Sequence, residues 1–413
     1  MRLLYTLIVF LLLPVALLYL LLRSRRQPGQ FKHLPERFGF YSEAVTSPLI
    51  WVHAVSIGET RAAEPLIRAL LARYPRHRIL LTHMTSTGRE TGETLFGDRV
   101  DRCYLPLDYP AAVARFLDHY RPQAGILMET ELWPNLIQGV GARSIPLFLV
   151  NARLSAKSHA AYRKLRGLTR DSLATFKAVA AQGADDARRL VDLGAGDVRV
   201  TGSLKFDIAL PVAQLELGRA FRQEVGEARP VLMAGSTREG EEALLLDVLP
   251  RIAVPGLLVA IVPRHPQRFD EVARLLEARG IRYQRRSSGK AVAAETRVVL
   301  GDSMGEMFAY YTACDVAFVG GSLVPLGGQN LIEACAAGKP VLIGPSNYNF
   351  SEATERATEA GAAIRVADAE GLAREAARLL RDPDELRRMS RAALAFAEAH
   401  RGATARVLEL IQL

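Results

Sequence analysis

Carboxylates follow two apolar runs of the chain, at positions where strands of a sheet would end. Glu59 comes shortly after the run at 49–54, beside Gly58, and stands at the expected start of a helix. A carboxylate at that position either acts as a general base on a substrate or only complements the helix dipole. The sequence leaves both interpretations of Glu59 open.

A second pair of carboxylates, Glu129 and Glu131, directly follows the strongly apolar run at 124–128. Because an unpaired charge at the end of a buried strand is costly, this pair needs either a chemical role or a cation such as Arg153. Lys205 follows the last apolar run in the first half of the chain. A lone lysine is usually a solvated surface charge, but this one stands just before the expected hinge between two domains.

Two stretches in the second half of the chain could bind a phosphate. Arg264 and His265 follow one apolar run, and a guanidinium at a strand end can bind a phosphate. Met304, Gly305 and Glu306 follow another run and open a helix, so that their backbone amides could hold a phosphate or the edge of a base.

Two further segments contain small residues next to a helix start. The segment 234–242 is a strand end, a small-residue turn and an acidic helix start, which makes it a weak anion nest. Glycine pairs at 320–321 and 327–328 precede a helix predicted at 330–337. We expect the amides of this glycine-rich turn to meet the phosphate of a nucleotide, and Glu333 to bind the hydroxyl pair of its ribose.

Several well-known catalytic motifs are missing from the sequence. It has no GxGxxG after its first predicted strand, no GxxxxGK[ST] and no GxSxG, and no cluster of histidines, cysteines or aspartates has metal-ligand spacing. We therefore expect neither a metal nor a cofactor. Cys103, Cys314 and Cys335 are far apart, which argues against a disulfide framework and favours the reducing cytoplasm.

The elements that must position these side chains alternate along the chain. Short apolar runs and longer amphipathic stretches follow one another from residue 49, which is typical of parallel sheets covered by helices. We predict strands at 49–54, 79–83, 102–105, 124–128, 146–150, 178–181 and 198–201, and a second series of seven that starts near 230 and ends near 366. The fold class is therefore α/β, with two Rossmann-like, doubly wound domains facing a cleft.

The 413 residues are enough for two such domains and an N-terminal segment. We predict a membrane anchor at 1–26, an N-terminal acceptor-binding domain at 27–207, a linker at 208–229 and a C-terminal nucleotide-binding domain at 230–413. The linker is assigned because this polar and helical stretch has no strand signal.

Residues 3–22 contain no charge and just match the hydrocarbon core of a bilayer if they form a helix. Arg23, Arg25 and Arg26 follow at once, so the positive-inside rule places the rest of the chain in the cytoplasm. A cleaved signal peptide and a helix lying in the membrane interface are the alternatives. The net charge of +9 favours anionic partners.

Read in order, the motifs HAVSIGE, METELWPN, NARLS, GSLKFD, VPRHP and GDSMGE, with the glycine-rich stretch, resemble the bacterial transferases of 3-deoxy-D-manno-octulosonic acid (Kdo). The resemblance covers nearly the whole chain. It implies a GT-B glycosyltransferase of lipopolysaccharide synthesis, anchored in the inner membrane with its catalytic domains in the cytoplasm. The implied donor is CMP-Kdo, the implied acceptor is a lipid A precursor, and nucleic acid is not a partner.

The resemblance also implies roles for individual residues. Glu59 matches the general base of an inverting transfer, and Glu129 and Lys205 match positions that stabilise the transition state. Many relatives read His-Asn-Pro-Leu-Glu where this chain begins with Gln329, so a ring nitrogen and a helix-starting proline are missing here. The stretches that match CMP-binding segments contain Arg264, His265, Met304, Gly305, Glu306, Asn330, Leu331, Ile332 and Glu333.

Two other functions fit the same pattern of strands and turns. One is a GT-B transferase or epimerase that uses a UDP-sugar, in which case UDP and not CMP would protect the nucleotide-binding domain from heat. The other is a membrane-anchored nucleotide-binding protein without catalysis, in which case Glu59→Ala would leave the function intact.

Overall fold

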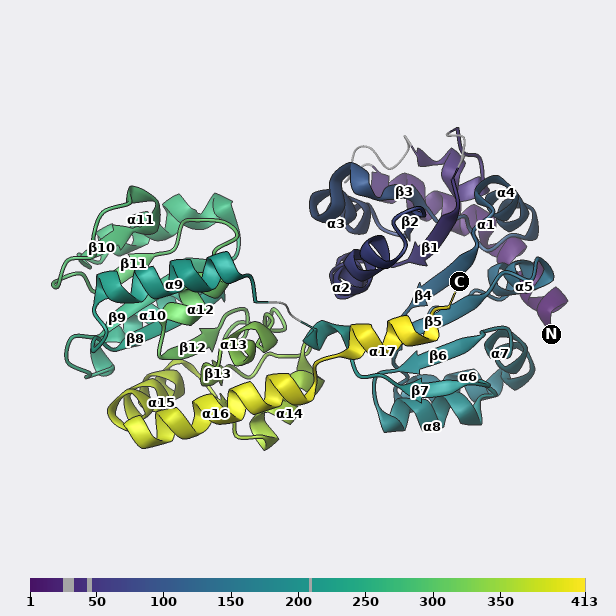
Figure 1. Ribbon diagram of the computed structural model, residues 1–413. Helices are drawn as coiled ribbons and strands as arrows, with labels where there is room; N and C mark the ends of the chain where they lie inside the picture. Colours follow the sequence, from purple (N-terminus) through teal and green to yellow (C-terminus); the bar gives the residue numbers. More distant parts are fainter. Residues whose placement is uncertain (25–32, 43–46, 208–209, 413) are drawn as a thin grey trace. The chain divides into compact units, whose positions relative to one another are not determined.

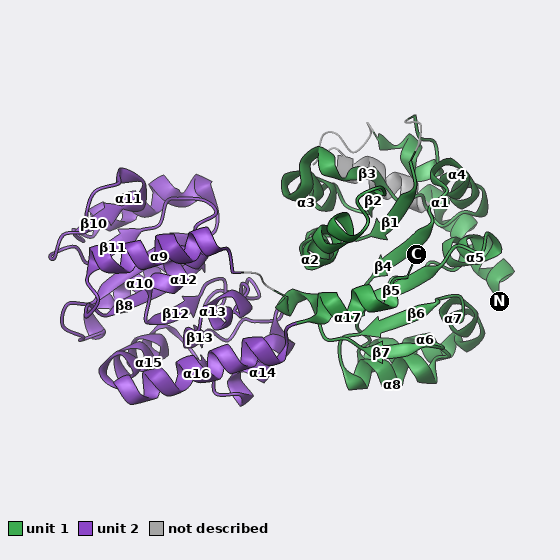
Figure 2. Ribbon diagram, in the orientation of Figure 1, with its two compact units in different colours: residues 1–207, 402–413 green, residues 208–401 purple. Residues whose placement is uncertain are grey.

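The computed structural model describes residues 1–24, 33–42, 47–207 and 210–412, except for the side chains of 15–24. The chain forms two compact units (Figure 2). Unit 1 consists of Met1–Asp207 and Gly402–Leu413, and unit 2 of Ile208–Arg401. Each unit contains a seven-stranded parallel sheet with helices on both faces (Figure 1). The prediction of two Rossmann-like domains is therefore confirmed.

The sheet of unit 1 has the strand order β3-β2-β1-β4-β5-β6-β7. Its order reverses between β1 and β4, which makes this point of the carboxyl edge the expected place for a ligand. The strands are β1 Leu49–His53, β2 Arg78–His83, β3 Asp101–Tyr104, β4 Ala124–Met128, β5 Leu147–Ala152, β6 Ala178–Ala181 and β7 Val198–Val200. The helices between them are α2 Ile57–Arg73, α3 Ser86–Phe96, α4 Pro110–Tyr120, α5 Pro134–Ala142, α6 Ala156–Lys164, α7 Arg166–Leu173 and α8 Ala184–Asp192, with the short 3-10 helix η3 Gly97–Arg99. Two further 3-10 helices, η2 Pro35–Phe38 and η4 Leu204–Phe206, lie before β1 and after β7.

The sheet of unit 2 has the order β10-β11-β9-β8-β12-β13-β14, which reverses between β8 and β12. Its strands are β8 Val231–Thr237, β9 Leu258–Pro263, β10 Tyr283–Arg285, β11 Val298–Leu300, β12 Val316–Val319, β13 Val341–Ile343 and β14 Ala363–Arg365. Its helices are α9 Val212–Val225, α10 Glu241–Val248, α11 Phe269–Ala278, α12 Met307–Ala313, α13 Ile332–Ala336, α14 Ser351–Glu359, α15 Ala369–Arg381 and α16 Pro383–Ala399, with η5 Leu249–Arg251, η6 Pro266–Arg268 and η7 Arg286–Ser288.

Continuous apolar runs form the strands because each sheet is covered on both faces. In β1, Leu49 and Trp51 belong to one core of unit 1, whereas Ile50 and Val52 belong to the core on the opposite face. Successive side chains of a strand point to opposite faces, so a sheet covered on both faces needs apolar residues at every position. This local requirement explains why the strands were predictable from the sequence.

The predicted C-terminal boundary at residue 413 is wrong for the second domain. Helix α17 (Ala403–Leu410) returns to unit 1, where Ala403, Val407 and Ile411 are fully buried in its core. These positions are four residues apart and form one apolar helix face. Arg406 Nε also donates a hydrogen bond to the carbonyl oxygen of Thr201 at 2.8 Å. The second domain therefore ends before Gly402.

The predicted linker at 208–229 is also wrong over most of its length. It contains α9, which packs against α12 of unit 2. The helices approach so closely that a Cβ atom on Gly218 would lie 2.5 Å from Thr312 Cβ and 2.6 Å from the oxygen of Ala309. An amphipathic helix has the same local pattern whether it connects domains or belongs to one, so the sequence did not distinguish the two.

Helix α1 (Arg2–Ser24) lies beside α5 of unit 1. Tyr5 Oη donates to Asp108 Oδ2 and Thr6 Oγ1 donates to Asn135 Oδ1, both at 2.9 Å. Within the described part of the chain, no helix combines the length and the apolar character needed to cross a membrane. The predicted anchor at 1–26 is thus not found among the described residues. The side chains of its second half, from residue 15, lie outside them.

Candidate active site

Glu59 lies in the first turn of α2, directly after β1, and its residue is 8% exposed. The backbone N–H of Val55 donates to Oε2 of Glu59 at 2.8 Å, and the hydroxyl of Ser56 donates to Oε1 at 3.3 Å. These bonds hold the carboxyl group back over the strand end, beside the point where the strand order reverses. A carboxyl group in this position can accept a proton from a substrate at the sheet edge.

Burial, as the largest cause, and the nearby carboxylates of Glu129 and Glu131 together raise the pKa of Glu59 to about 7. The hydrogen bonds from Val55 and Ser56 act in the opposite direction. A base with a pKa close to neutral is half deprotonated at physiological pH and still accepts a proton readily. The burial of this side chain therefore favours the general-base interpretation over a mere complement to the helix dipole.

Glu129 and Lys205 form an ion pair at the same edge of the sheet, with Lys205 Nζ 3.5 Å from Glu129 Oε1. Glu129 directly follows β4 and has a left-handed backbone, with φ +57°. Lys205 lies in η4, after β7. The structure therefore brings together the three residues predicted to act in catalysis, Glu59, Glu129 and Lys205, and the cation paired with Glu129 is Lys205.

Asn151, near the end of β5, holds η4 in place. Its backbone is also left-handed, with φ +56°, and its side chain is fully buried. The N–H of Leu204 donates to Asn151 Oδ1 at 3.1 Å, and Gln182 Nε2 donates to the carbonyl oxygen of Asn151 at 2.9 Å. Asn151 thus links the end of β5 to the residue that precedes Lys205.

At the carboxyl edge of the sheet in unit 2, Arg264 and His265 follow β9. Partial burial lowers the pKa of His265, and the positive charges of Arg238, Arg264 and Arg268 lower it further. Arg268 is partly neutralised, since it pairs with Glu242 at 2.7 Å. Several guanidinium groups therefore surround His265 at this strand end, which suits an anion.

The turn of Met304, Gly305 and Glu306 lies between β11 and α12. Met304 is 64% exposed, and Ser303 Oγ donates to Glu306 Oε2 at 2.5 Å. Gln214 of α9 holds the turn, because its Nε2 donates to the carbonyl oxygen of Gly305 and its Oε1 accepts from the N–H of Phe308. The segment predicted as a linker thus supports one of the predicted binding stretches.

The four residues 330–333 divide into two partly buried polar residues and two buried apolar ones. Asn330 Oδ1 accepts from the N–H of Ile332 at 3.0 Å, and Asn330 Nδ2 donates to Glu333 Oε1 at 3.3 Å. Leu331 and Ile332 are at most 1% exposed. Their side chains belong to the interior, so any contact of these two residues with a nucleotide would be made by their backbone, and the prediction that the stretch binds CMP stays a prediction.

The glycine-rich turn itself differs from the prediction in one important respect. The N–H groups of Gly321, Ser322 and Leu323 donate to the carboxylate of Glu241, at 2.5, 3.0 and 2.9 Å. Our expectation that the amides of this turn meet a phosphate is therefore wrong for these three, because an internal carboxylate already occupies them.

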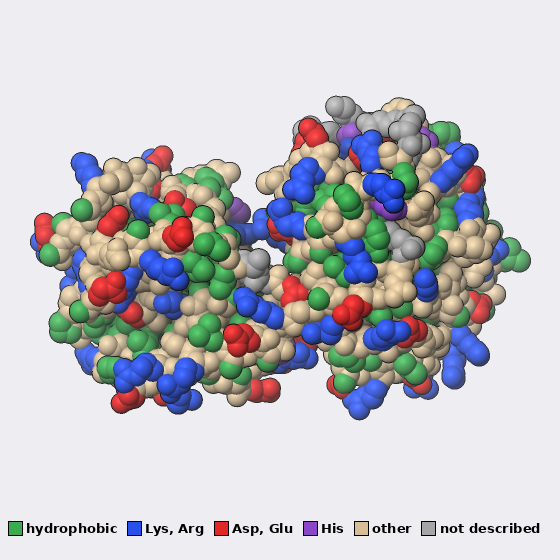
Figure 3. Space-filling view, in the orientation of Figure 1, with side chains coloured by type: hydrophobic (Ala, Val, Ile, Leu, Met, Phe, Trp, Pro, Cys, Tyr) green, Lys and Arg blue, Asp and Glu red, His purple; other side chains and the backbone are tan. Residues whose placement is uncertain are grey.

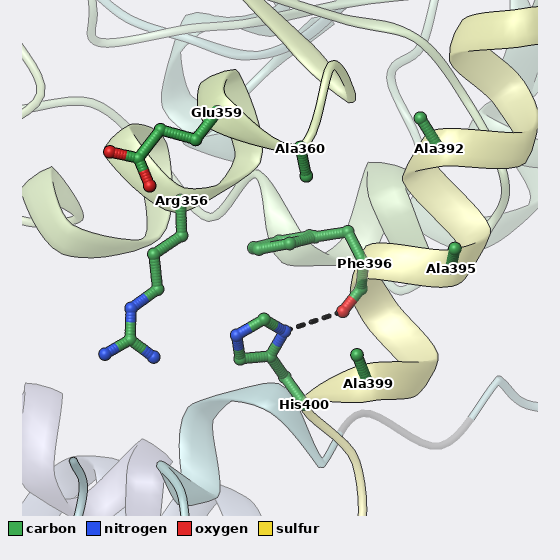
Figure 4. Close-up of a pocket in the computed structure, with 8 residues that line it drawn as sticks. All are labelled: Arg356, Glu359, Ala360, Ala392, Ala395, Phe396, Ala399 and His400. Atoms are coloured by element: carbon green, nitrogen blue, oxygen red, sulfur yellow. Dashed lines mark hydrogen bonds between the residues drawn. The ribbon is translucent and has the colours of Figure 1, made fainter. Parts of the chain in front are cut away.

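A hollow in unit 2 lies apart from these groups in the fold, between α14 and α16 (Figure 4). His400 Nδ1 donates to the carbonyl oxygen of Phe396 at 2.8 Å across one side of it. Half of the lining residues are alanines, whose short side chains leave the space unfilled. The lining residues, Arg356, Glu359, Ala360, Ala392, Ala395, Phe396, Ala399 and His400, include no residue of the predicted site.

Comparison with known proteins identifies the family. A model of the family 3-Deoxy-D-manno-octulosonic-acid transferase (kdotransferase) matches residues 32–208, and a model of glycosyl transferases group 1 matches 281–396. The 3-deoxy-D-manno-octulosonic acid transferase of Bordetella pertussis is 47% identical over 99% of this chain and 98% of its own length. The chain belongs to the 3-deoxy-D-manno-octulosonic acid transferases. The resemblance carried by the motifs is thereby confirmed.

One further relative supports the assignment of this Kdo transferase, and one solved structure shares its fold. The 3-deoxy-D-manno-octulosonic acid transferase of Haemophilus influenzae is 37% identical over 100% of this chain and 98% of its own length. Among solved structures, the UDP-GlcNAc 2-epimerase of Neisseria meningitidis superimposes with a TM-score of 0.57 at 15% identity, over 88% of this chain and 99% of that one. The likeness to the epimerase concerns the fold alone.

The sequence pointed to most of the polar edge of this Kdo transferase but missed several supporting residues. Glu241, Arg238 and Gln214 were not singled out, although the first two stand in the segment interpreted as a weak anion nest. Two adjacent glutamates after a small-residue turn were the available signal for Glu241, and nothing in the pattern of α9 distinguished Gln214 from any other surface side chain.

Proposed function

We propose that this Kdo transferase is an inverting enzyme that moves Kdo from CMP-Kdo to a lipid A precursor, lipid IVA, in lipopolysaccharide biosynthesis. Glu59 is the general base. The observation that carries the proposal is the buried carboxyl group of Glu59, with a pKa of about 7, beside the ion pair of Glu129 and Lys205. Family membership supplies the sugar, and the resemblance of the motifs supplies the nucleotide and the acceptor.

In the proposed reaction, a hydroxyl group of the acceptor attacks the anomeric carbon of Kdo. A bond forms between that carbon and the acceptor oxygen, and the bond to the phosphate oxygen of CMP breaks with its electron pair going to CMP. The hydroxyl proton passes to Glu59. Lys205 supplies positive charge where negative charge develops, and Glu129 holds Lys205 in position through its ion pair.

The donor is doubly anionic, since it carries a phosphate and the carboxylate of Kdo, and unit 2 offers matching charge. Arg238 and Arg264 lie at the ends of β8 and β9 and supply this charge, whereas the lowered pKa of His265 beside them disfavours its charged form. Figure 3 shows Lys and Arg side chains spread over the visible face of both units, with acidic side chains between them. Donor binding therefore depends on this local group of cations, and not on one large basic patch of the visible face.

We also place the enzyme at the cytoplasmic face of the inner membrane, with α1 as the membrane-binding element. The polar side chains of Tyr5 and Thr6 face unit 1, whereas the apolar side chains on the other side of the helix are exposed. An apolar helix face of this kind inserts readily into the boundary between headgroups and acyl chains. The exposed residues are Leu3, Leu4, Leu7, Ile8, Phe10, Leu11 and Leu12.

Transfer from CMP-Kdo, generated in situ, to a tetraacylated lipid A precursor tests the proposed activity by mass spectrometry of the lipid. Wild type, Glu59→Ala and Glu64→Ala are compared, because Glu64 lies on the same helix and pairs with Arg68 at the surface. We expect a Kdo mass increment with wild type and Glu64→Ala, and none with Glu59→Ala. A folded wild type without an increment would shift the proposal to a UDP-sugar.

Flotation with vesicles of phosphatidylethanolamine and phosphatidylglycerol tests the membrane proposal. The double variant Leu7→Ser, Leu11→Ser should float markedly less than wild type. Leu165→Ser, which changes an exposed leucine elsewhere on unit 1, is the matched control and should float as wild type does. Equal flotation of all three proteins would remove α1 from the proposal.

A further inference from the structure

Glu241, at the start of α10, is a fully buried carboxylate that accepts four backbone hydrogen bonds. Oε2 accepts from the N–H of Gly321 at 2.5 Å and of Arg238 at 2.9 Å. Oε1 accepts from the N–H of Ser322 at 3.0 Å and of Leu323 at 2.9 Å. Burial raises the pKa of Glu241 above its ordinary value, although all four of these bonds act in the opposite direction. Only an ionised carboxylate can use both oxygens as acceptors for four donors.

These bonds join the two strand ends at which the order of the sheet reverses. Arg238 follows β8, and Gly321 to Leu323 follow β12, the neighbouring strand. Successive backbone N–H groups of this kind form an anion nest, and in many proteins such a nest at a switch point binds a phosphate of the ligand. Here the protein fills the nest with its own anion.

The anchored turn supports the rest of the glycine-rich stretch. The N–H of Gly328 donates to the carbonyl oxygen of Gly321 at 2.8 Å, and the N–H of Gln329 donates to that of Gly320 at 3.0 Å. Ser322 fixes the turn from the other side, because its hydroxyl accepts from the N–H of Gly344 at 2.9 Å. A continuous chain of hydrogen bonds therefore leads from Glu241 to the residue before Asn330.

We infer that Glu241 is a positioning residue for donor binding, which takes the place of a ligand phosphate in the nest and holds the glycine-rich stretch so that Asn330 and Glu333 can bind the nucleotide. The inference rests on the proposed function for the identity of the donor. Its consequence is that the donor phosphate binds to other groups of the edge, and not to the amides of Gly321, Ser322 and Leu323.

The neighbouring carboxylates, Glu242 and Glu239, differ from Glu241 in their surroundings. Glu242 is equally buried, but its Oε1 binds Arg268 Nη1 at 2.7 Å and Thr237 Oγ1 at 2.6 Å, so it belongs to a side-chain cluster. Glu239 lies in the same turn and is exposed. Glu239→Ala is therefore a matched control that removes a carboxylate two residues away and leaves the nest intact.

The full-length variants Glu241→Gln, Glu241→Ala and Glu239→Ala test the inference. In Glu241→Gln, one acceptor oxygen is replaced by an NH2 group that faces N–H donors. We expect the KM for the donor to rise at least about tenfold in both Glu241 variants, with kcat and the KM for the acceptor changed by less than about threefold. A role in folding alone would lower the active fraction, and hence kcat, without this selective rise in the donor KM.

Chemical rescue provides a readout that needs no donor. In Glu241→Ala, acetate can enter the space left by the side chain and accept the same four N–H groups. Sodium acetate should raise the melting temperature of Glu241→Ala relative to the same concentration of sodium chloride, with no such difference for wild type or Glu239→Ala. In transfer assays acetate should also lower the donor KM of Glu241→Ala.

The outcomes separate the inference from the proposed function. If wild type does not transfer Kdo from CMP-Kdo, the proposed function fails, but the acetate effect still reports on the nest. If wild type transfers Kdo and both Glu241 variants keep its donor KM, the inference is overturned. An absent acetate effect on folded Glu241→Ala would overturn it as well.

Discussion

Lys205 Nζ lies 3.5 Å from Glu129 Oε1, and the two side chains are about equally exposed, at 33% and 31%. A half-exposed ion pair contributes little to stability, since solvent screens it. Its value to this Kdo transferase is geometric, because it fixes a cation at the edge of the sheet beside Glu59.

Lys205→Met should lower kcat about 100-fold or more, because it removes the positive charge that we propose stabilises the transition state. Stability should change little. The double variant with Glu129→Gln should be scarcely slower than Lys205→Met, since residues that act as one unit do not contribute additively. Lys157→Met, which changes an exposed lysine of α6, should leave kcat unchanged. An equal kcat for wild type and Lys205→Met would refute this role.

The rate of transfer should fall on the acid side of neutral pH. Because the pKa of Glu59 is raised to about 7, its carboxyl group becomes protonated as the pH falls through 7 and can no longer accept a proton. We expect kcat/KM of wild type to decrease about tenfold per pH unit below that value. Glu59→Gln should lose about 10²- to 10⁴-fold in rate and lack this acid limb. A flat wild-type profile would contradict Glu59 as the base.

Glu59 should also make stability depend on pH. Its folded pKa of about 7 exceeds the unfolded value, so the stability that its protonated form contributes is full below the unfolded pKa and is lost as the pH rises through 7. Glu59→Gln does not titrate. It should therefore exceed wild type by about 3 kcal/mol at alkaline pH, and the difference should vanish near pH 4, about the unfolded pKa.

Urea denaturation at the two pH values measures this effect. Glu64→Gln, whose wild-type carboxylate is partly exposed and bonded to Arg68, is the control and should show no comparable dependence on pH. If Glu59→Gln is less stable than wild type at alkaline pH, the ionised carboxylate of Glu59 does not destabilise the folded protein, and the expected effect is refuted.

Two substitutions at Asn151 distinguish the energetic cost of the left-handed backbone from the cost of losing the side-chain hydrogen bond. Asn151→Ala and Asn151→Gly both leave the N–H of Leu204 without its acceptor, at a cost of about 1–3 kcal/mol. Alanine is also strained at the left-handed φ of +56°, whereas glycine is not. Asn151→Ala should therefore be less stable than Asn151→Gly by about 1–2 kcal/mol. Thermal and urea unfolding measure the difference. Both variants should lower kcat, because Lys205 is no longer held in place.

Gly218→Ala tests whether α9 belongs to unit 2. Alanine is the better helix former by about 1 kcal/mol, but its Cβ would lie 2.5 Å from Thr312 Cβ and the helices would have to separate. We expect a net loss of about 1–3 kcal/mol in unfolding experiments, as in other overpacked interiors. Ala220→Gly, at an exposed position of the same helix, should lower the free energy of unfolding by only about 1 kcal/mol, because glycine has the lower helix propensity. A Gly218→Ala protein more stable than wild type would mean that α9 is not docked in this way.

The strands of unit 1 and the polar groups at their carboxyl edge could be predicted because their signals are local. A strand buried on both faces needs an uninterrupted apolar run, as in β4. Parallel strands place their carboxyl ends at one edge, so that Glu59 and Glu129, after neighbouring strands, had to lie close together. The stretches predicted to bind the donor also follow strand ends, as the sequence indicated.

The domain boundaries could not be predicted, because amphipathic helices do not specify their partners. The apolar spacing of Ala403, Val407 and Ile411 fits any core, and only the folded chain shows that this face closes unit 1. The apolar residues Leu331 and Ile332 stand in a stretch predicted to bind the donor, yet they are buried, since a helix start needs interior contacts as well as a polar face.

The sequence by itself determined the two parallel sheets, the polar groups at their carboxyl edges and the family, because these depend on residue types at short spacing. The tertiary structure decided which groups meet. It paired Lys205 with Glu129, raised the pKa of Glu59 by burial, and filled the nest at β8 and β12 with Glu241. Hydrogen bonds and burial between distant segments depend on distances in space, which residue spacing along a chain does not contain.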